Sequence, residues 1–68
     1  MIYVFKTSVK TKTQIRFLSF YLNSLLQEAR WNFDLDDCDK ILRIESQAEI
    51  TEATIELLQT KGFECVEL

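Results

Sequence analysis

The sequence contains no histidine and no proline, and it has one glycine and two cysteines in 68 residues. The absence of histidine removes the commonest general base and a frequent zinc ligand. No serine or cysteine has a recognisable base as its partner in the sequence, and no glycine-rich phosphate loop is present. We therefore expect a protein that is not an enzyme and that holds no cofactor.

Long hydrophobic runs are also missing. The first apolar run, residues 1–5, ends at Lys6 and is far too short for a signal peptide or a membrane span. A composition of 47% apolar and 28% charged residues is typical of a globular chain of this size. We expect one domain over residues 1–68, located in the cytoplasm without a membrane partner, with Cys38 and Cys65 as free thiols.

The charge is unevenly distributed along the chain. Residues 1–30 carry five basic side chains and one acidic side chain, whereas residues 31–68 carry ten acidic and three basic side chains. The net charge of −3 argues against nucleic acid as a partner, because such proteins need a dominant basic field. A local basic spot remains near the start of the chain.

Hydrophobic periodicity predicts the first half of the fold. Residues 2–5 are β-branched or aromatic, which favours a strand. A helix is expected from Thr11 to about Ala29, because apolar residues recur there at helical spacing: Ile15, Leu18, Leu22, Leu25, Leu26 and Ala29. Alternation over residues 31–35 predicts a strand, and residues 41–45 follow an acidic turn as its hairpin partner.

A second helix and a last strand complete the pattern. Thr51 is the expected cap of this helix, although a capping box of Ser46 and Glu49 would start it earlier. Thr54, Leu57 and Leu58 are expected on its buried side. Gly62 is expected to end the helix in the left-handed conformation, before a strand over residues 63–68.

The order strand, helix, strand, strand, helix, strand predicts an α+β, ferredoxin-like βαββαβ sandwich. Right-handed crossovers place two helices on one face of a four-stranded antiparallel sheet. In that topology the loop before the first helix, the turn at Cys38 and the loop before Phe63 lie at one end. A binding site is expected at that end.

With these elements in place, the chain resembles the heavy-metal-associated domain family of small copper-chaperone-like modules. The likeness is carried by Ile15, Leu18 and Leu22 in the first helix, by the hairpin over residues 31–44, and by the step Lys61-Gly62-Phe63. The resemblance implies the ferredoxin-like fold. In members that carry metal, it also implies a Met-x-Cys-x-x-Cys motif on the first loop.

The family's metal positions hold other residues in this chain. Counting back from Ile15, the two cysteine positions fall on Thr11 and Gln14, and Val9 stands in place of the methionine. The same register puts Lys6 where the family usually buries an apolar side chain. Soft metals such as Cu(I) select thiolates, so we expect no metal at Thr11 and Gln14.

Thr11 and Gln14 have the spacing of a capping box, which is the interpretation we favour for this loop. The Thr11 hydroxyl can accept the N–H of Gln14 while the Gln14 amide reaches back to the N–H of Thr11. The alternative is a small-anion site, in which Lys10, Lys12 and Arg16 surround the positive end of the helix. The loop has no glycine that would let a phosphate approach the backbone closely.

The two cysteines receive different interpretations. Cys38 lies in a turn with Asp36, Asp37 and Asp39, whose charges suppress the reactive thiolate. This group could hold a divalent ion loosely, but its spacing matches no calcium loop, and a solvated turn is the favoured reading. A relocated metal site that uses Cys38 stays open as an alternative, whereas Cys65 is expected on the covered face as a small hydrophobe.

The first helix carries more aromatic residues than its core side requires. Phe17 and Tyr21 are four residues apart beside the buried side, and Phe20 lies on a neighbouring row. If exposed together, they form a partner surface. Apolar residues on the uncovered sheet face, Ile2, Val4, Ile41 and Val66, offer a second one.

The sequence thus predicts a small interaction module with a degenerate metal-chaperone-like fold that has lost soft-metal binding. We expect its partner to be a protein or a second copy of the chain. Metal binding through Cys38 and sensing of a small anion are the alternatives.

Overall fold

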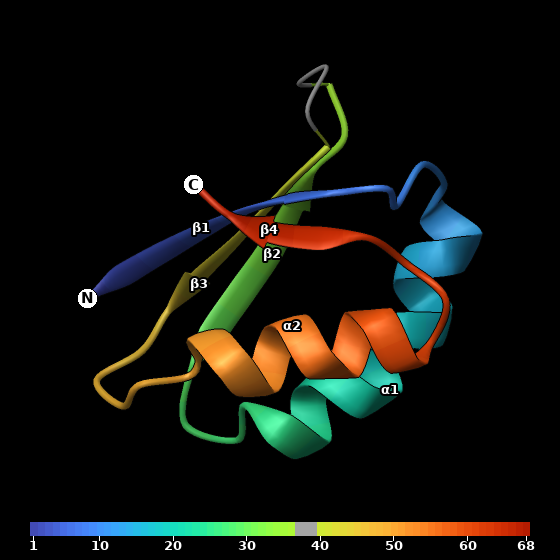
Figure 1. The fold of residues 1–68 in the computed structure, drawn as a ribbon. Coiled ribbons are helices and arrows are strands. Elements are labelled where there is room, and N and C mark those ends of the chain that lie inside the picture. Colours follow the sequence, from blue (N-terminus) through green and yellow to red (C-terminus); the bar gives the residue numbers. More distant parts are fainter. Residues whose placement is uncertain (37–39) are drawn as a thin grey trace.

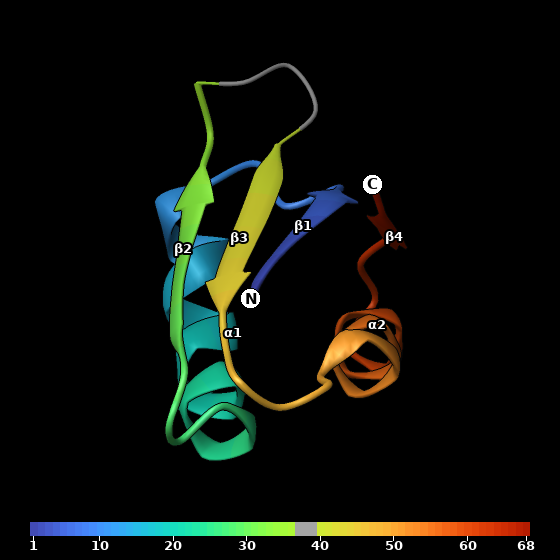
Figure 2. The same ribbon diagram turned by 90° about the vertical axis from the view of Figure 1, so that its left-hand side faces the viewer.

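A computed structural model describes residues 1–36 and 40–68 of the chain. Its elements, in chain order, are β1 (Ile2–Thr7), α1 (Lys12–Leu25), β2 (Arg30–Asp34), β3 (Ile41–Glu45), α2 (Thr51–Thr60) and β4 (Cys65–Glu67). The four strands form one antiparallel sheet in the order β2-β3-β1-β4. Both helices cover the same face of this sheet (Figures 1 and 2). The predicted α+β, ferredoxin-like architecture is confirmed.

Helix α1 is shorter than the periodicity predicted. It ends at Leu25, and the N–H of Leu26 in the cap position donates to the carbonyl of Leu22 at 2.8 Å. Leu26 still packs into the core from this position, which is why the apolar spacing continues beyond the helix. Leu25, one of the apolar residues at helical spacing, is 40% exposed and lies outside the core. Ala29 lies in the turn that leads to β2.

The start of α2 also differs from its prediction. Ile50 is the cap residue and makes no side-chain capping bond, so neither Thr51 as cap nor a Ser46–Glu49 capping box is correct. Instead, Glu49 Oε1 accepts the N–H of Thr51 at 2.7 Å, and Ser46 Oγ accepts the N–H of Ala48 at 3.1 Å. The Thr51 side chain, followed by its N–H, holds the pKa of Glu49 below the ordinary value.

Gly62 ends α2 as predicted, with φ at 91°. The N–H of Gly62 donates to the carbonyl of Gln59, and the N–H of Phe63 donates to that of Leu58, which together form a Schellman motif. The N–H of Phe63 is engaged in this motif and that of Glu64 donates to Ser8 Oγ, and the last strand starts only at Cys65 and is shorter than predicted.

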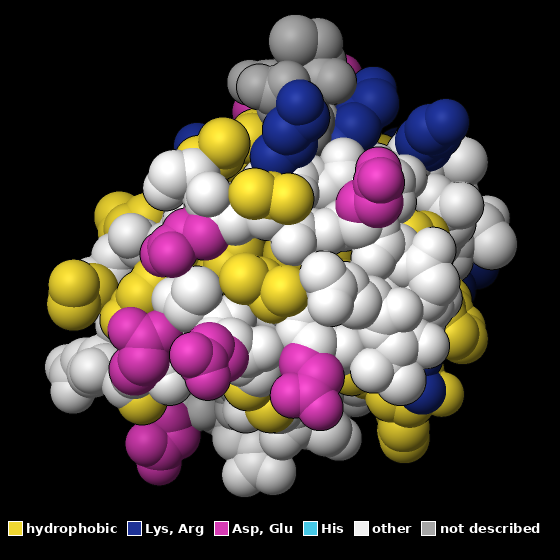
Figure 3. All heavy atoms as spheres, viewed as in Figure 1, with side chains coloured by type: hydrophobic (Ala, Val, Ile, Leu, Met, Phe, Trp, Pro, Cys, Tyr) yellow, Lys and Arg dark blue, Asp and Glu magenta, His cyan; other side chains and the backbone are white. Residues whose placement is uncertain are grey.

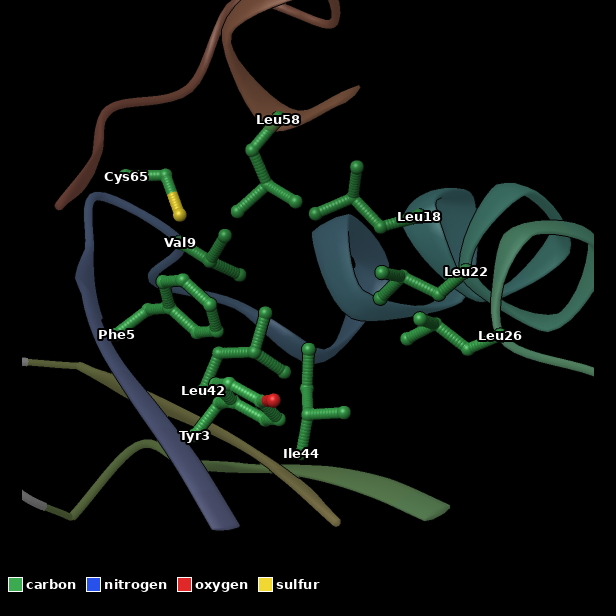
Figure 4. Packing of buried hydrophobic residues seen from close by; sticks show 10 residues of the cluster. All are labelled: Tyr3, Phe5, Val9, Leu18, Leu22, Leu26, Leu42, Ile44, Leu58 and Cys65. Carbon is green, nitrogen blue, oxygen red and sulfur yellow. The ribbon is translucent and has the colours of Figure 1, made fainter. Parts of the chain in front are cut away.

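The core lies between the sheet and the helices (Figure 4). Its fully buried hydrophobic side chains come from β1, β3, both helices and the loop before α1: Phe5, Val9, Leu18, Leu22, Leu42, Ile44 and Leu58. Burying a side chain of this kind contributes about 1.5–3 kcal/mol. Cys65 is buried as predicted, and its sulfur points toward Phe5 and Val9 (Figure 4).

Within residues 1–36 and 40–68, no helix lies over the other face of the sheet (Figure 2). Ile2 and Val66 are 61% and 59% exposed there. Ile41 shares this face, since it pairs with Lys6 of β1, but it is only 6% exposed. Ile41 therefore cannot contribute to a contact surface as the sequence suggested.

Candidate functional site

The loop before α1 is held by a complete capping box. Thr11, in an extended conformation, accepts the N–H of Gln14 on its hydroxyl at 3.1 Å. Gln14 Oε1 accepts the N–H of Thr11 at 3.3 Å and also that of Lys10 at 2.7 Å. Thr11 and Gln14 thus act as a helix cap, as predicted.

Side-chain hydroxyls join this loop to the two neighbouring ones. Thr7 Oγ1 donates to the carbonyl of Lys40 at 2.7 Å and accepts the N–H of Val9 at 3.2 Å. Ser8 and Glu64 bond twice: Ser8 Oγ accepts the N–H of Glu64 at 2.8 Å, and the N–H of Ser8 donates to the carbonyl of Glu64 at 3.2 Å. The loop before α1 therefore meets the loop before β4 and Lys40 at one end, whereas the turn at Cys38 lies outside the described residues. Hydrogen bonds within the chain already occupy much of the backbone of these loops.

The loop offers little to a soft metal. Val9 is fully buried, while Thr11 and Gln14 present a hydroxyl and a carboxamide that both serve the cap. Within residues 1–36 and 40–68, no group of three His, Cys, Asp or Glu side chains is arranged to hold a metal ion. The alternative site at Cys38 lies outside the described residues.

The basic residues of the anion hypothesis surround the same helix end. Lys10, Lys12 and Arg16 are all exposed. In Figure 3, Lys and Arg side chains gather at the end of the molecule near the hairpin turn, whereas most Asp and Glu side chains lie toward the opposite end. The amides of Lys10 and Thr11 point to Gln14 and that of Gln14 points to Thr11, so three donors are already engaged.

Phe17, Phe20 and Tyr21 come together on α1, and we call them the aromatic cluster. The ring centroids of Phe17 and Phe20 lie 5.5 Å and 5.2 Å from that of Tyr21, both in edge-to-face geometry. Phe20 is 70% exposed and Phe17 is 48% exposed, whereas Tyr21 is half-buried. The predicted candidate interface residues therefore form one contiguous patch.

Lys61 completes this patch and was missed by the sequence analysis. Its Nζ lies 3.9 Å from the centroid of the Tyr21 ring, which is the geometry of a cation–π contact. Lys61 is the C-cap residue of α2, so the contact links the end of one helix to the middle of the other. Periodicity within each helix predicts a buried side but not which residues of two helices meet, and no sequence signal marked this pair.

Cys65 has no role at the surface. Its burial raises the pKa of the thiol to about 11, so the thiol stays protonated near neutral pH. A protonated, buried thiol is neither a metal ligand nor a nucleophile.

The order of the elements and the sheet defines the chain as an α+β domain with a ferredoxin-like fold. Comparison with family models, curated proteins and solved structures finds no match to this chain. None of the helices within residues 1–36 and 40–68 has both the length and the apolar character needed to cross a membrane.

Proposed function

We propose that the chain is a small non-enzymatic interaction module that binds a protein partner through the aromatic cluster. The observation that carries this proposal is the exposure of Phe17 and Phe20 in edge-to-face contact with Tyr21. The acidic balance of the chain favours a protein over a nucleic acid as the partner. The resemblance to the heavy-metal-associated family stays a prediction.

The geometry of the aromatic cluster suits binding. Removing a large apolar side chain from water contributes about 1.5–3 kcal/mol, and most of the Phe20 ring is accessible to a partner. The neighbouring rings and Lys61 hold Tyr21 in place, which lowers the entropy lost when a partner orders these side chains. Tyrosine is among the residue types that are enriched in binding hot spots.

Loss of soft-metal binding is the second part of the proposal. It is supported by Thr11 and Gln14, which offer no thiolate and are hydrogen-bonded to each other. The space that a family carrier would use for metal exchange is, in this chain, a helix start joined to its neighbouring loops.

A photo-crosslinking residue placed at position 20, in cells that express the chain, tests the proposed surface. The matched control carries the same residue at position 66, since Val66 is 59% exposed on the opposite face. We expect a discrete protein adduct from position 20 that a second substitution, Phe17→Glu, reduces, and no such adduct from position 66. The mass of the adduct distinguishes a second copy from another protein. Equal labelling from both positions, or none from position 20, would refute the proposal.

A further inference from the structure

Strand β2 is an edge strand of the sheet. Its outer edge presents backbone N–H and C=O groups. Among the strands that the structure describes, β2 pairs with β3 alone (Figure 2). In an antiparallel strand, the backbone N–H and C=O groups of successive residues point alternately toward its two edges. The hydrogen bonds across the sheet show which residues of β2 point away from β3.

The alternation is fixed at the ends of β1. Met1 and Ser46 exchange both backbone hydrogen bonds, at 2.9 Å and 3.0 Å, and the N–H of Thr7 donates to the carbonyl of Lys40. Hydrogen-bonded pairs recur at every second position, so Tyr3↔Ile44 and Phe5↔Leu42 are also hydrogen-bonded pairs. The backbone N–H and C=O groups of Ile44 and Leu42 therefore point toward β1. The backbone N–H and C=O groups of the intervening residues of β3, at positions 41, 43 and 45, point toward β2.

It follows that residues 30, 32 and 34 of β2 bond to β3, because they are the partners of residues 45, 43 and 41. The N–H and C=O groups of Trp31 and Phe33 then point outward from the sheet. Among the described residues, no backbone group outside the strand ladders pairs with them. An uncovered edge of this kind is a template for another strand.

When two copies of β2 are placed side by side in antiparallel orientation, their side chains are complementary in charge and type. About a two-fold axis at Asn32, Arg30 of one copy lies opposite Asp34 of the other, and Trp31 lies opposite Phe33. Such a register gives two opposite-charge pairs and two aromatic pairs, both of which stabilise neighbouring antiparallel strands. Trp31 and Phe33 are the residues whose backbone groups point outward, so the same register forms four intermolecular backbone hydrogen bonds.

We infer that two copies of this chain associate through antiparallel pairing of β2 about Asn32, which joins their sheets into one. Arg30 then lies between Glu45 of its own chain, its partner in the β2–β3 register, and Asp34 of the second copy. The interface uses none of the aromatic cluster, so a partner protein can still bind α1. The inference stands independently of the proposed function, and each can fail alone.

The opposite edge of the sheet is less suited to self-pairing. Strand β4 has three residues against five in β2, and the charged residues at its end and just before it, Glu67 and Glu64, are both acidic. Two copies joined there would bring like charges together without a basic partner, which is unfavourable. Charge complementarity therefore selects β2.

A charge-reversal set tests this interface by sedimentation equilibrium. Wild type, Asp34→Arg, Arg30→Asp and the double variant are compared at chain concentrations up to about 1 mM, which also reveals weak association. We expect a dimeric wild type and a rise of about tenfold or more in the dimer Kd for each single variant, because both attractive pairs become repulsive. The double variant and an equimolar mixture of the two single variants should regain the dimer.

Residues 30 and 34 are both exposed, so the variants are expected to fold, which circular dichroism checks. Arg30→Asp also places an acid opposite Glu45 of its own chain, so Asp34→Arg is the cleaner single variant. Hydrogen exchange gives an independent readout: the amides of Trp31 and Phe33 should become protected as concentration rises. A monomeric wild type, a dimer indifferent to charge reversal, or unprotected Trp31 and Phe33 amides in the dimer would overturn the inference.

Discussion

Thr11 and Gln14 cap each other: the Thr11 hydroxyl accepts the N–H of Gln14 at 3.1 Å, and Gln14 Oε1 accepts the N–H of Thr11 at 3.3 Å. The resemblance to the heavy-metal-associated family, which stays a prediction, places these two residues where metal-carrying members present two thiolates. In a metal carrier, this spacing lets two sulfur atoms bind one ion. In this chain, the same spacing lets two side chains accept two backbone N–H groups at the start of a helix.

Thr11→Ala should lower the free energy of unfolding by about 1 kcal/mol, because it removes the acceptor for the N–H of Gln14. Gln14→Ala should also destabilise the chain, since Gln14 Oε1 serves two amides. The two losses should not add in the double variant, because both belong to one capping box. Urea unfolding measures each value. Thr13→Ala, an exposed position in the same turn, is the control that should not destabilise the chain; additive losses would contradict the coupling.

Thr54→Val should stabilise the protein. Thr54 is fully buried, and its Oγ1 has no hydrogen-bond partner among the described residues. Replacing this hydroxyl with a methyl of similar size removes a desolvation cost of about 1–3 kcal/mol and keeps the volume filled. Thermal unfolding measures the gain. Thr54→Ala, which leaves a cavity, should show none, and an unchanged or lower midpoint for the valine variant would show that the hydroxyl is satisfied.

The Cys65 thiol should be protected from thiol reagents in the folded state. In a Cys38→Ser background, the rate of reaction of Cys65 with a disulfide reagent at pH 8 should be limited by opening of the fold, because the thiol is buried and protonated. Urea should raise the rate to that of a free thiol. Fast labelling of the native chain would mean that Cys65 is accessible.

Stability should also fall at alkaline pH for the same reason. The pKa of Cys65 is raised from 9.0 to about 11 in the folded state, so the unfolded chain loses this proton first as pH rises. The contribution of Cys65 to the free energy of unfolding is complete below about pH 9 and is lost between there and about pH 11. Unfolding curves across this range, with Cys65→Ala as the variant that lacks the titration, measure the difference.

Lys61→Met should loosen the aromatic cluster by removing the cation from the face of Tyr21 while keeping an unbranched side chain. We expect a loss of about 0.5–1 kcal/mol in the free energy of unfolding and altered ring resonances of Tyr21 in NMR spectra. Lys61→Arg should retain most of both, since a guanidinium also stacks on an aromatic ring. Equal behaviour of the two variants would mean that the contact has no energetic role.

The order of elements followed from the sequence because each helix and strand has a clear apolar period and Gly62 marks the end of α2. The capping box also followed, because it depends only on residues three apart. Helix ends were predicted less well. Leu26 continues the spacing of α1 from outside the helix, and Glu49 substitutes for a side-chain cap at α2.

Contacts between elements were not accessible to sequence reasoning. The approach of Lys61 to Tyr21 depends on how α1 and α2 lie against each other, and the burial of Ile41 on the uncovered face does not follow from alternation alone. The outward direction of the Trp31 and Phe33 backbone groups likewise requires the register of three strands. These are tertiary properties, and local patterns carry no signal for them.

Titration of the purified chain with Cu(I) against a competing chelator tests the central claim most directly, with a Cys38→Ser variant measured in parallel. The account predicts no tight stoichiometric binding in the variant, and an affinity that returns when Thr11 and Gln14 are both replaced by cysteine. Tight one-to-one binding that survives in Cys38→Ser and is lost on Thr11→Ala would contradict it, because the first loop would then hold a metal ion rather than serve as a helix cap.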